Sequence, residues 1–243
     1  MLSRKRLRFQ GSTLNARHHG AHAGFTLAEL LVSMLLSSII MGGVYSVYRM
    51  QSHTMKIQEK RLDAQDYARS VLDMMVREIR NAGNNPKGAV SAGALGTNCA
   101  GGSAGAPGVV TAGAQSFRFT YDFQGTTAGS VPNGTCDNAD EDITYALDAT
   151  CSGGGSLGNI TRNGSANPLT DCNVVTNSFT ISYFKQDGTS LTAPVTAGNL
   201  ALIQRVQITL TVQSKNPDSQ FGGQQLDATM TSSVDLRNRG LPS

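Results

Sequence analysis

The amino-acid sequence predicts an α+β protein in which one long N-terminal helix precedes an antiparallel sheet. Three observations predict this class: an apolar run at residues 25–48, a helical stripe in the polar sequence after it, and alternating strands in the C-terminal half. No strong helix breaker separates the apolar run from the polar sequence. One continuous helix is therefore expected from about Phe25 to Asn81.

The apolar run, from Phe25 to Tyr48, is long enough to span a membrane, for which about 20 residues suffice. Residues 1–24 carry five Lys or Arg and no acid, whereas the rest of the chain has 15 basic and 17 acidic residues. Because basic residues mark the cytoplasmic side of a span, we expect a cytoplasmic leader and a periplasmic C-terminal domain. A basic folded surface, as a nucleic-acid partner would require, is not indicated.

The helix is expected to continue beyond the membrane as an amphipathic segment, residues 49–81. Ala68, Leu72, Met75 and Ile79 fall at spacings of four, three and four, which places them on one helix face. The stretch from Asn81 to Pro86 combines Asn, Gly and Pro and predicts the end of the helix.

Residues 82–116 contain nine glycines and one charge, so we expect a long glycine-rich loop there. Period-two alternation then predicts an antiparallel sheet domain over residues 117–243, with one face covered by the helix stripe. Asp187-Gly188 is expected to form a hairpin turn. The alternating apolar positions are Phe117, Phe119, Tyr121 and Phe123; Ile143, Tyr145 and Leu147; Phe179, Ile181 and Tyr183; Val206, Ile208, Leu210 and Val212; and, more weakly, residues 226–236.

Four cysteines, Cys99, Cys136, Cys151 and Cys172, all follow the apolar run and contain no C-x-x-C pair. An even number of cysteines in an oxidising compartment indicates two disulfides rather than a metal site. Sequence alone leaves three connectivities open. We favour Cys151–Cys172, because these residues bracket a short segment, which leaves Cys99 with Cys136.

No catalytic, cofactor or metal site is predicted. Neither an H-E-x-x-H nor a P-loop pattern is present, and no histidine follows His53, which argues against a hydrolase triad. The acidic cluster at residues 136–142 offers oxygen ligands for calcium, but its spacing differs from an EF-hand loop. A solvated acidic turn is the commoner explanation of such a cluster.

One acid, Glu29, lies near the start of the apolar run. Burial of a carboxylate at the centre of a bilayer costs roughly 2.5–3.5 kcal/mol on insertion scales, so such residues usually have a polar partner and a function. A secretory signal has a shorter apolar region followed by a cut site. A plain anchor fits the length but explains neither Glu29 nor the Gly24-Phe25 junction. A cut at Gly24 would create an amine on Phe25, close to Glu29.

The stretch G-F-T-L-A-E-L-L-V, residues 24–32, resembles the prepilin signal of type IV pilins and type II secretion pseudopilins. The resemblance implies a pilin-like fold, cleavage after Gly24 by prepilin peptidase, N-methylation of Phe25, and a part for Glu29 in filament assembly. The partners it implies are other major and minor pilins and an inner-membrane assembly platform.

The segments R-E-I-R-N-A-G, I-T-R-N-G and V-D-L-R-N-R-G, at residues 77–83, 160–164 and 234–240, resemble PilW-type minor pilins. That resemblance implies a minor subunit of a type IV pilus, made in the inner membrane, exposed on the cell surface in the filament, and active in a tip or priming complex. A J-type pseudopilin of type II secretion has the same features. An anchored periplasmic binding or adhesive domain is a further alternative.

Overall fold

The computed structural model describes residues 24–86, 108–125, 127, 129–151, 156–214 and 226–236. Contacts divide the chain into two units, residues 1–52 and 53–243, and each is described by itself. The basic leader, apart from Gly24, and Cys99 lie outside the described residues. So do the last residues of the V-D-L-R-N-R-G segment.

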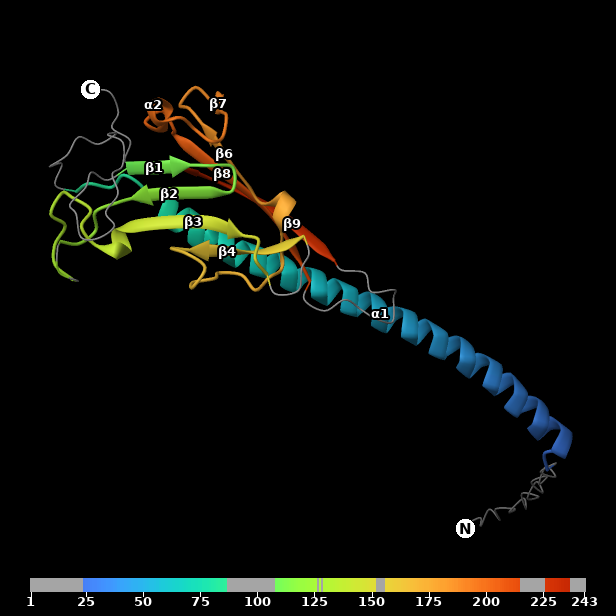
Figure 1. Cartoon of the computed structure of the whole chain (residues 1–243). Coiled ribbons are helices and arrows are strands. Elements are labelled where there is room, and N and C mark those ends of the chain that lie inside the picture. Colours follow the sequence, from blue (N-terminus) through green and yellow to red (C-terminus); the bar gives the residue numbers. More distant parts are fainter. Residues whose placement is uncertain are drawn as a thin grey trace, which may run out of the picture. The chain divides into compact units, whose positions relative to one another are not determined.

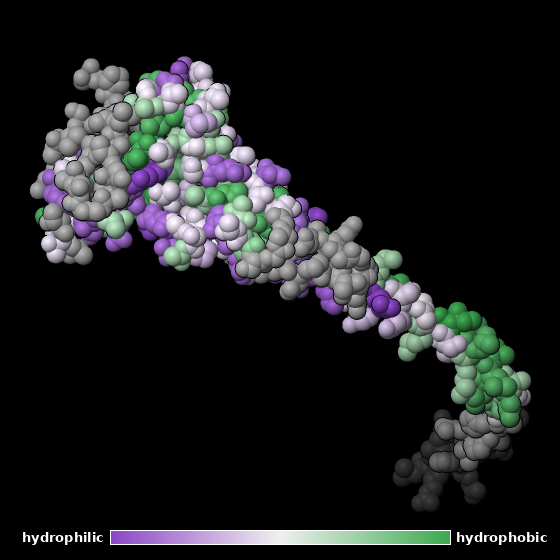
Figure 2. All heavy atoms as spheres, viewed as in Figure 1, coloured by the Kyte–Doolittle hydropathy of each residue, from purple (hydrophilic) through white to green (hydrophobic). Residues whose placement is uncertain are grey.

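Helix α1 runs from Leu27 to Ile79 and crosses the boundary between the two units. Within the first unit, residues 27–51 of the helix are exposed, and apolar side chains cover most of that stretch (Figure 2). Within the second unit the predicted stripe is confirmed. Ala68, Leu72, Met75 and Ile79 are at most 2% exposed, and Ala64 and Val71 extend the buried face.

The second unit contains one curled antiparallel sheet in the order β1-β2-β3-β4-β5-β8-β6-β7, with β9 also paired to β8 (Figure 1). This confirms the α+β class. The strands are β1 Gly108–Ala112, β2 Ser116–Thr120, β3 Asp142–Asp148, β4 Leu157–Arg162, β5 Val174–Val175, β6 Thr180–Phe184, β7 Ser190–Leu191, β8 Arg205–Gln213 and β9 Asp227–Asp235, with the short helix α2 at Ala197–Leu200.

The predicted loop at residues 82–116 is wrong in its last part, where strand β1 pairs with β2. The glycine count concealed a short β-branched segment. Val109 and Ala112 of that segment are at most 3% exposed, which is why it forms a strand. Strand β2 also ends earlier than its alternation predicts. Tyr121 and Phe123 follow it in a loop, and Phe123 is 47% exposed.

The core forms where the buried stripe of α1 meets the apolar side of the sheet. Phe117, Phe119 and Tyr145 are fully buried, and their rings lie 5.4 to 6.3 Å apart in successive pairs. Asp187-Gly188 turns the chain between β6 and β7 as predicted, with Gly188 at φ 84°. The alternating apolar residues of these strands, which lie far apart in the sequence, thus pack in one common core.

A polar contact joins the last turn of α1 to the sheet. Glu78 Oε2 accepts hydrogen bonds from the phenol of Tyr145 on β3, at 2.5 Å, and from Nε of Arg162 on β4, at 3.0 Å. Tyr145 is fully buried, while the Glu78 and Arg162 side chains are 22% and 25% exposed. The R-E-I-R-N-A-G and I-T-R-N-G segments therefore meet in space and fasten the helix to two strands.

Candidate functional site

The site predicted from the sequence lies at the start of α1. Thr26 and Glu29 form a reciprocal capping box there: the Glu29 carboxylate accepts from the Thr26 N–H and hydroxyl, both at 3.0 Å. The Thr26 hydroxyl in turn accepts the Glu29 N–H at 3.3 Å. This pairing satisfies backbone donors that the first helical turn leaves open. The uncut chain thus holds Glu29 beside the peptide that precedes the helix.

Thr26 was not predicted as a site residue, although the sequence carries a signal for it. T-x-x-E directly before an apolar helix is the usual pattern of a capping box. Because the Thr26 bonds fix the carboxylate over the helix N-terminus, they orient Glu29 toward the Phe25–Thr26 peptide. A positive charge created at Phe25 would therefore arise close to an acid that is already in place.

Gly24 and Phe25 precede the first helical residue and are exposed, Phe25 by 89%. Among the described residues, a Cβ added at Gly24 would meet nothing within 4 Å, and Gly24 is not one of the glycines with a positive φ. The fold of this segment therefore places no demand on glycine at position 24. Any requirement for glycine there must come from a partner that handles the chain.

After Glu29, the next charged residue of α1 is Arg49. Among the described residues, α1 is the one helix long and apolar enough to cross a membrane, and none of its most apolar window is buried. Leu31, Leu35, Ile39 and Ile40 are 59 to 66% exposed. An exposed apolar surface of this length is expected to lie in lipid or against other apolar helices.

The acidic cluster at residues 136–142 differs from a solvated turn. Glu141 is fully buried, and its two carboxylate oxygens accept four backbone N–H groups, from Phe123, Gln124, Asp137 and Asn138, at 2.9 to 3.3 Å. Asp142 forms a bidentate pair with Arg118 at 2.6 and 2.8 Å. Over the described residues, no group of three or more His, Cys, Asp and Glu side chains is placed to hold a metal ion.

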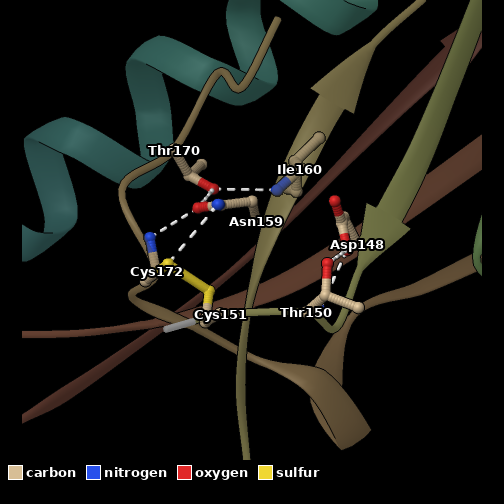
Figure 3. The surroundings of a disulfide bond; sticks show 7 residues. All are labelled: Asp148, Thr150, Cys151, Asn159, Ile160, Thr170 and Cys172. Carbon is tan, nitrogen blue, oxygen red and sulfur yellow. Dashed lines mark hydrogen bonds between the residues drawn. A yellow bond between two sulfur atoms is a disulfide. The ribbon is translucent and has the colours of Figure 1, made fainter. Parts of the chain in front are cut away.

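Cys151 and Cys172 form a disulfide with their Cα atoms 5.7 Å apart, which is the pairing that the sequence analysis favours. Asn159 of β4 supports it: Oδ1 accepts the Cys172 N–H and Nδ2 donates to Cys172 Sγ at 3.4 Å (Figure 3). Cys136 is also disulfide-bonded. Its predicted partner, Cys99, lies outside the described residues.

The double variant Cys151→Ser plus Cys172→Ser is expected to lose about 3 kcal/mol of unfolding free energy. The disulfide restricts the unfolded chain by joining two residues that are 21 positions apart, and the variant removes that restriction. Replacing both cysteines avoids a lone thiol that could exchange with the bond at Cys136. Urea unfolding followed by circular dichroism measures the change. Ser178→Ala, which removes one hydroxyl bonded to the Val175 carbonyl, is the control. Equal midpoints for the double variant and wild type would contradict the expectation.

Residues 20–45 match the family model described as the prokaryotic N-terminal methylation motif. No curated protein and no solved structure matches the chain. The matched residues include Gly24, Phe25, Glu29 and most of the exposed apolar helix. The match supports a protein of the type IV pilin or pseudopilin kind, which is structural rather than catalytic. It also implies processing by prepilin peptidase and assembly with other pilins.

Proposed function

We propose that this protein is a minor pilin, a low-copy structural subunit of a type IV pilus that takes part in a tip or priming complex. The observation that carries the proposal is the coincidence of three features in one segment. The methylation motif, an exposed Gly24-Phe25 junction and an exposed apolar helix occur together. A folded sheet domain follows on the same helix.

In this proposal the leader stays in the cytoplasm, the apolar part of α1 spans the inner membrane, and the sheet domain lies in the periplasm. Prepilin peptidase cuts between Gly24 and Phe25, and Phe25 is N-methylated. The assembly platform then moves the chain into a filament, where residues 25–48 pack against other pilins. The same exposed apolar surface thus contacts lipid first and neighbouring helices later.

Glu29 has a specific part in this transfer. Cleavage creates a positive amine on Phe25, next to the residue whose N–H the Glu29 carboxylate already accepts. An ion pair between that amine, of the same or a neighbouring chain, and Glu29 would offset part of the cost of placing the two charges in an apolar environment. Because the ion pair forms at one position along the filament axis, it favours a fixed axial stagger between neighbouring subunits.

Mass spectrometry of the N-terminus of the mature protein tests the proposal. A chain that begins at methylated Phe25 and co-purifies with sheared pili is the expected result. An intact leader on an otherwise folded chain would overturn the proposal in favour of an anchored periplasmic domain.

Deletion of the gene separates the type IV pilus from the type II secretion system. Loss of surface pili supports the minor pilin, whereas loss of enzyme secretion assigns the chain to the J-type pseudopilins.

Glu29→Gln is expected to lower the amount of this chain in filaments by about tenfold or more, since 1.4 kcal/mol of lost pairing gives that factor. Gln can still cap the helix, so the variant removes the charge and retains the capping interaction. Immunoblots of the pilus fraction and of membranes measure the change. Ser33→Ala, which removes an exposed hydroxyl bonded to the Leu30 carbonyl, is the matched control. Normal incorporation of the Gln variant would show that assembly needs no charge at Glu29.

A further inference from the structure

Strand β9 forms an edge of the sheet. It pairs with β8 at every one of its 9 residues, from Asp227 opposite Gln213 to Asp235 opposite Arg205, without a shift in register. Among the strands that the structure describes, β8 is its one partner. A regular edge of this length presents a row of backbone hydrogen-bonding groups on its outer side.

The hydrogen bonds that flank the ladder show which residues face outward. Leu236 N–H donates to the Gln204 carbonyl, and Ser214 N–H donates to the Leu226 carbonyl, both within the same register. In an antiparallel pair, hydrogen-bonded positions alternate with non-bonded ones. The even-numbered residues of β9 therefore bond to β8, and the odd-numbered residues direct their N–H and C=O groups to the open side.

The side chains of β9 alternate between the two faces of the sheet. Ala228 and Val234 are at most 4% exposed and face the core. The side chains of the five odd-numbered residues point to the other face and are all exposed; they are Asp227, Thr229, Thr231, Ser233 and Asp235. Edges are commonly protected by charged side chains, proline or a bulge; β9 has no proline and no bulge, and its charges, Asp227 and Asp235, lie only at its two ends.

The charges of β9 disfavour a second copy of the same strand as the partner. In an antiparallel pair centred on Thr231, Asp227 of each copy would lie opposite Asp235 of the other, which brings like charges together twice. Gln213 Nε2 donates to Asp227 at 3.0 Å but leaves its charge in place. A strand with a basic residue near each end would instead form two favourable pairs.

We propose that the outer edge of β9 accepts, by strand addition, an extended segment of a different polypeptide that carries a basic residue near each end. The backbone groups of the odd-numbered residues provide the hydrogen bonds, and the two terminal aspartates select the charge pattern. This inference goes beyond the proposed function, because it requires neither cleavage at Gly24 nor a filament.

Binding of a labelled nine-residue peptide, Lys-Thr-Val-Thr-Val-Thr-Val-Thr-Lys, to the full chain in detergent micelles tests the proposal by fluorescence anisotropy. Thr231→Pro removes one outward N–H without removing a ladder bond to β8, and is expected to weaken binding about tenfold. Thr231→Val is the matched control: it too loses the hydroxyl bonded to Thr209 but retains the N–H, and should bind like wild type.

The preference for basic residues is tested by reversing the charges at the two ends of β9. Asp227→Lys plus Asp235→Lys is expected to reverse the preference between this peptide and one with glutamate at both ends. Absence of binding to wild type, or equal binding by the Pro and Val variants, would overturn the proposal. Self-association of the chain that is lost in Thr231→Pro would assign the edge to a second copy and would also overturn it.

Discussion

Gly24→Val is expected to leave the leader attached while the folded part of the chain stays intact. A Cβ at Gly24 would meet no atom of the described residues within 4 Å, and φ there is not positive, so valine is expected to fit without backbone strain. Cleavage is the step that should suffer. A drop of at least about tenfold in the cut form requires only about 1.4 kcal/mol at the transition state of the peptidase reaction.

Intact-mass measurement of the membrane-extracted protein separates the cut and uncut forms, and circular dichroism checks that the fold persists. Gly42→Val is the matched control, because Gly42 lies in α1 and a Cβ there also meets nothing within 4 Å. The control should be cut like wild type. A normally cut Gly24→Val chain would show that the exposed junction is not handled by a glycine-requiring peptidase, and would count against the proposed function.

Local patterns were sufficient to predict most of the fold. The stripe of Ala68, Leu72, Met75 and Ile79 identified the buried side of α1, because burial of one helix face imposes a period of 3.6 residues on the sequence. Burial of one face of a strand likewise imposes a period of two residues. This alternation predicted β3, β6 and β8 to within a residue or two of their bounds. Such periods can be recognised in the sequence without knowing which segments pack against one another.

Contacts between distant segments could not be predicted in this way. Glu78 and Arg162 each occur in a segment that the sequence analysis singled out, yet nothing in either segment shows that they meet across 84 positions. Glu141 likewise has the composition of a surface acid, and only the surrounding loop, which directs four N–H groups at its carboxylate, explains its burial. These contacts depend on tertiary packing rather than on local periodicity.

The candidate site was predictable in part. An acid five residues after a glycine at the start of an apolar run indicated the processing segment. The Thr26 hydroxyl and the geometry that fixes Glu29 over the helix end came from the structure. The open edge of β9 came from the structure too, because alternation shows which side chains are buried but not which backbone groups lack a partner.

Glu78→Ala is expected to destabilise the sheet-bearing unit by about 2 kcal/mol. The substitution leaves the buried Tyr145 hydroxyl without its acceptor and the Arg162 guanidinium without its carboxylate. Loss of one partner of a buried pair costs about 3–5 kcal/mol, and we reduce that value because Glu78 and Arg162 are partly exposed. Urea unfolding of the full chain in micelles measures the loss.

A double-mutant cycle separates the contact from general damage to the helix end. Glu78→Ala, Arg162→Ala and the double variant should show a coupling of about 1 kcal/mol, since neighbours that share a partner are not additive. Asp73→Ala, at an exposed position of the same helix, is the control and should change the unfolding midpoint little. Additive effects of the two substitutions would mean that the ion pair contributes nothing of its own.

The same contact makes stability depend on alkaline pH. Burial and the adjacent Glu78 carboxylate raise the pKa of the Tyr145 phenol well above its ordinary value of 10.0. The native state therefore holds the phenol neutral, whereas the unfolded chain ionises near pH 10. The stabilisation is complete below that pH and is lost as the pH rises above it.

Burial also raises the pKa of Tyr183 and Tyr121, so Tyr145→Phe should reduce the fall of stability above pH 10 without abolishing it. In Glu78→Ala, only burial would still raise the native pKa of the phenol, so the fall should begin at the same pH but be smaller than in an Arg162→Ala chain, which keeps the carboxylate.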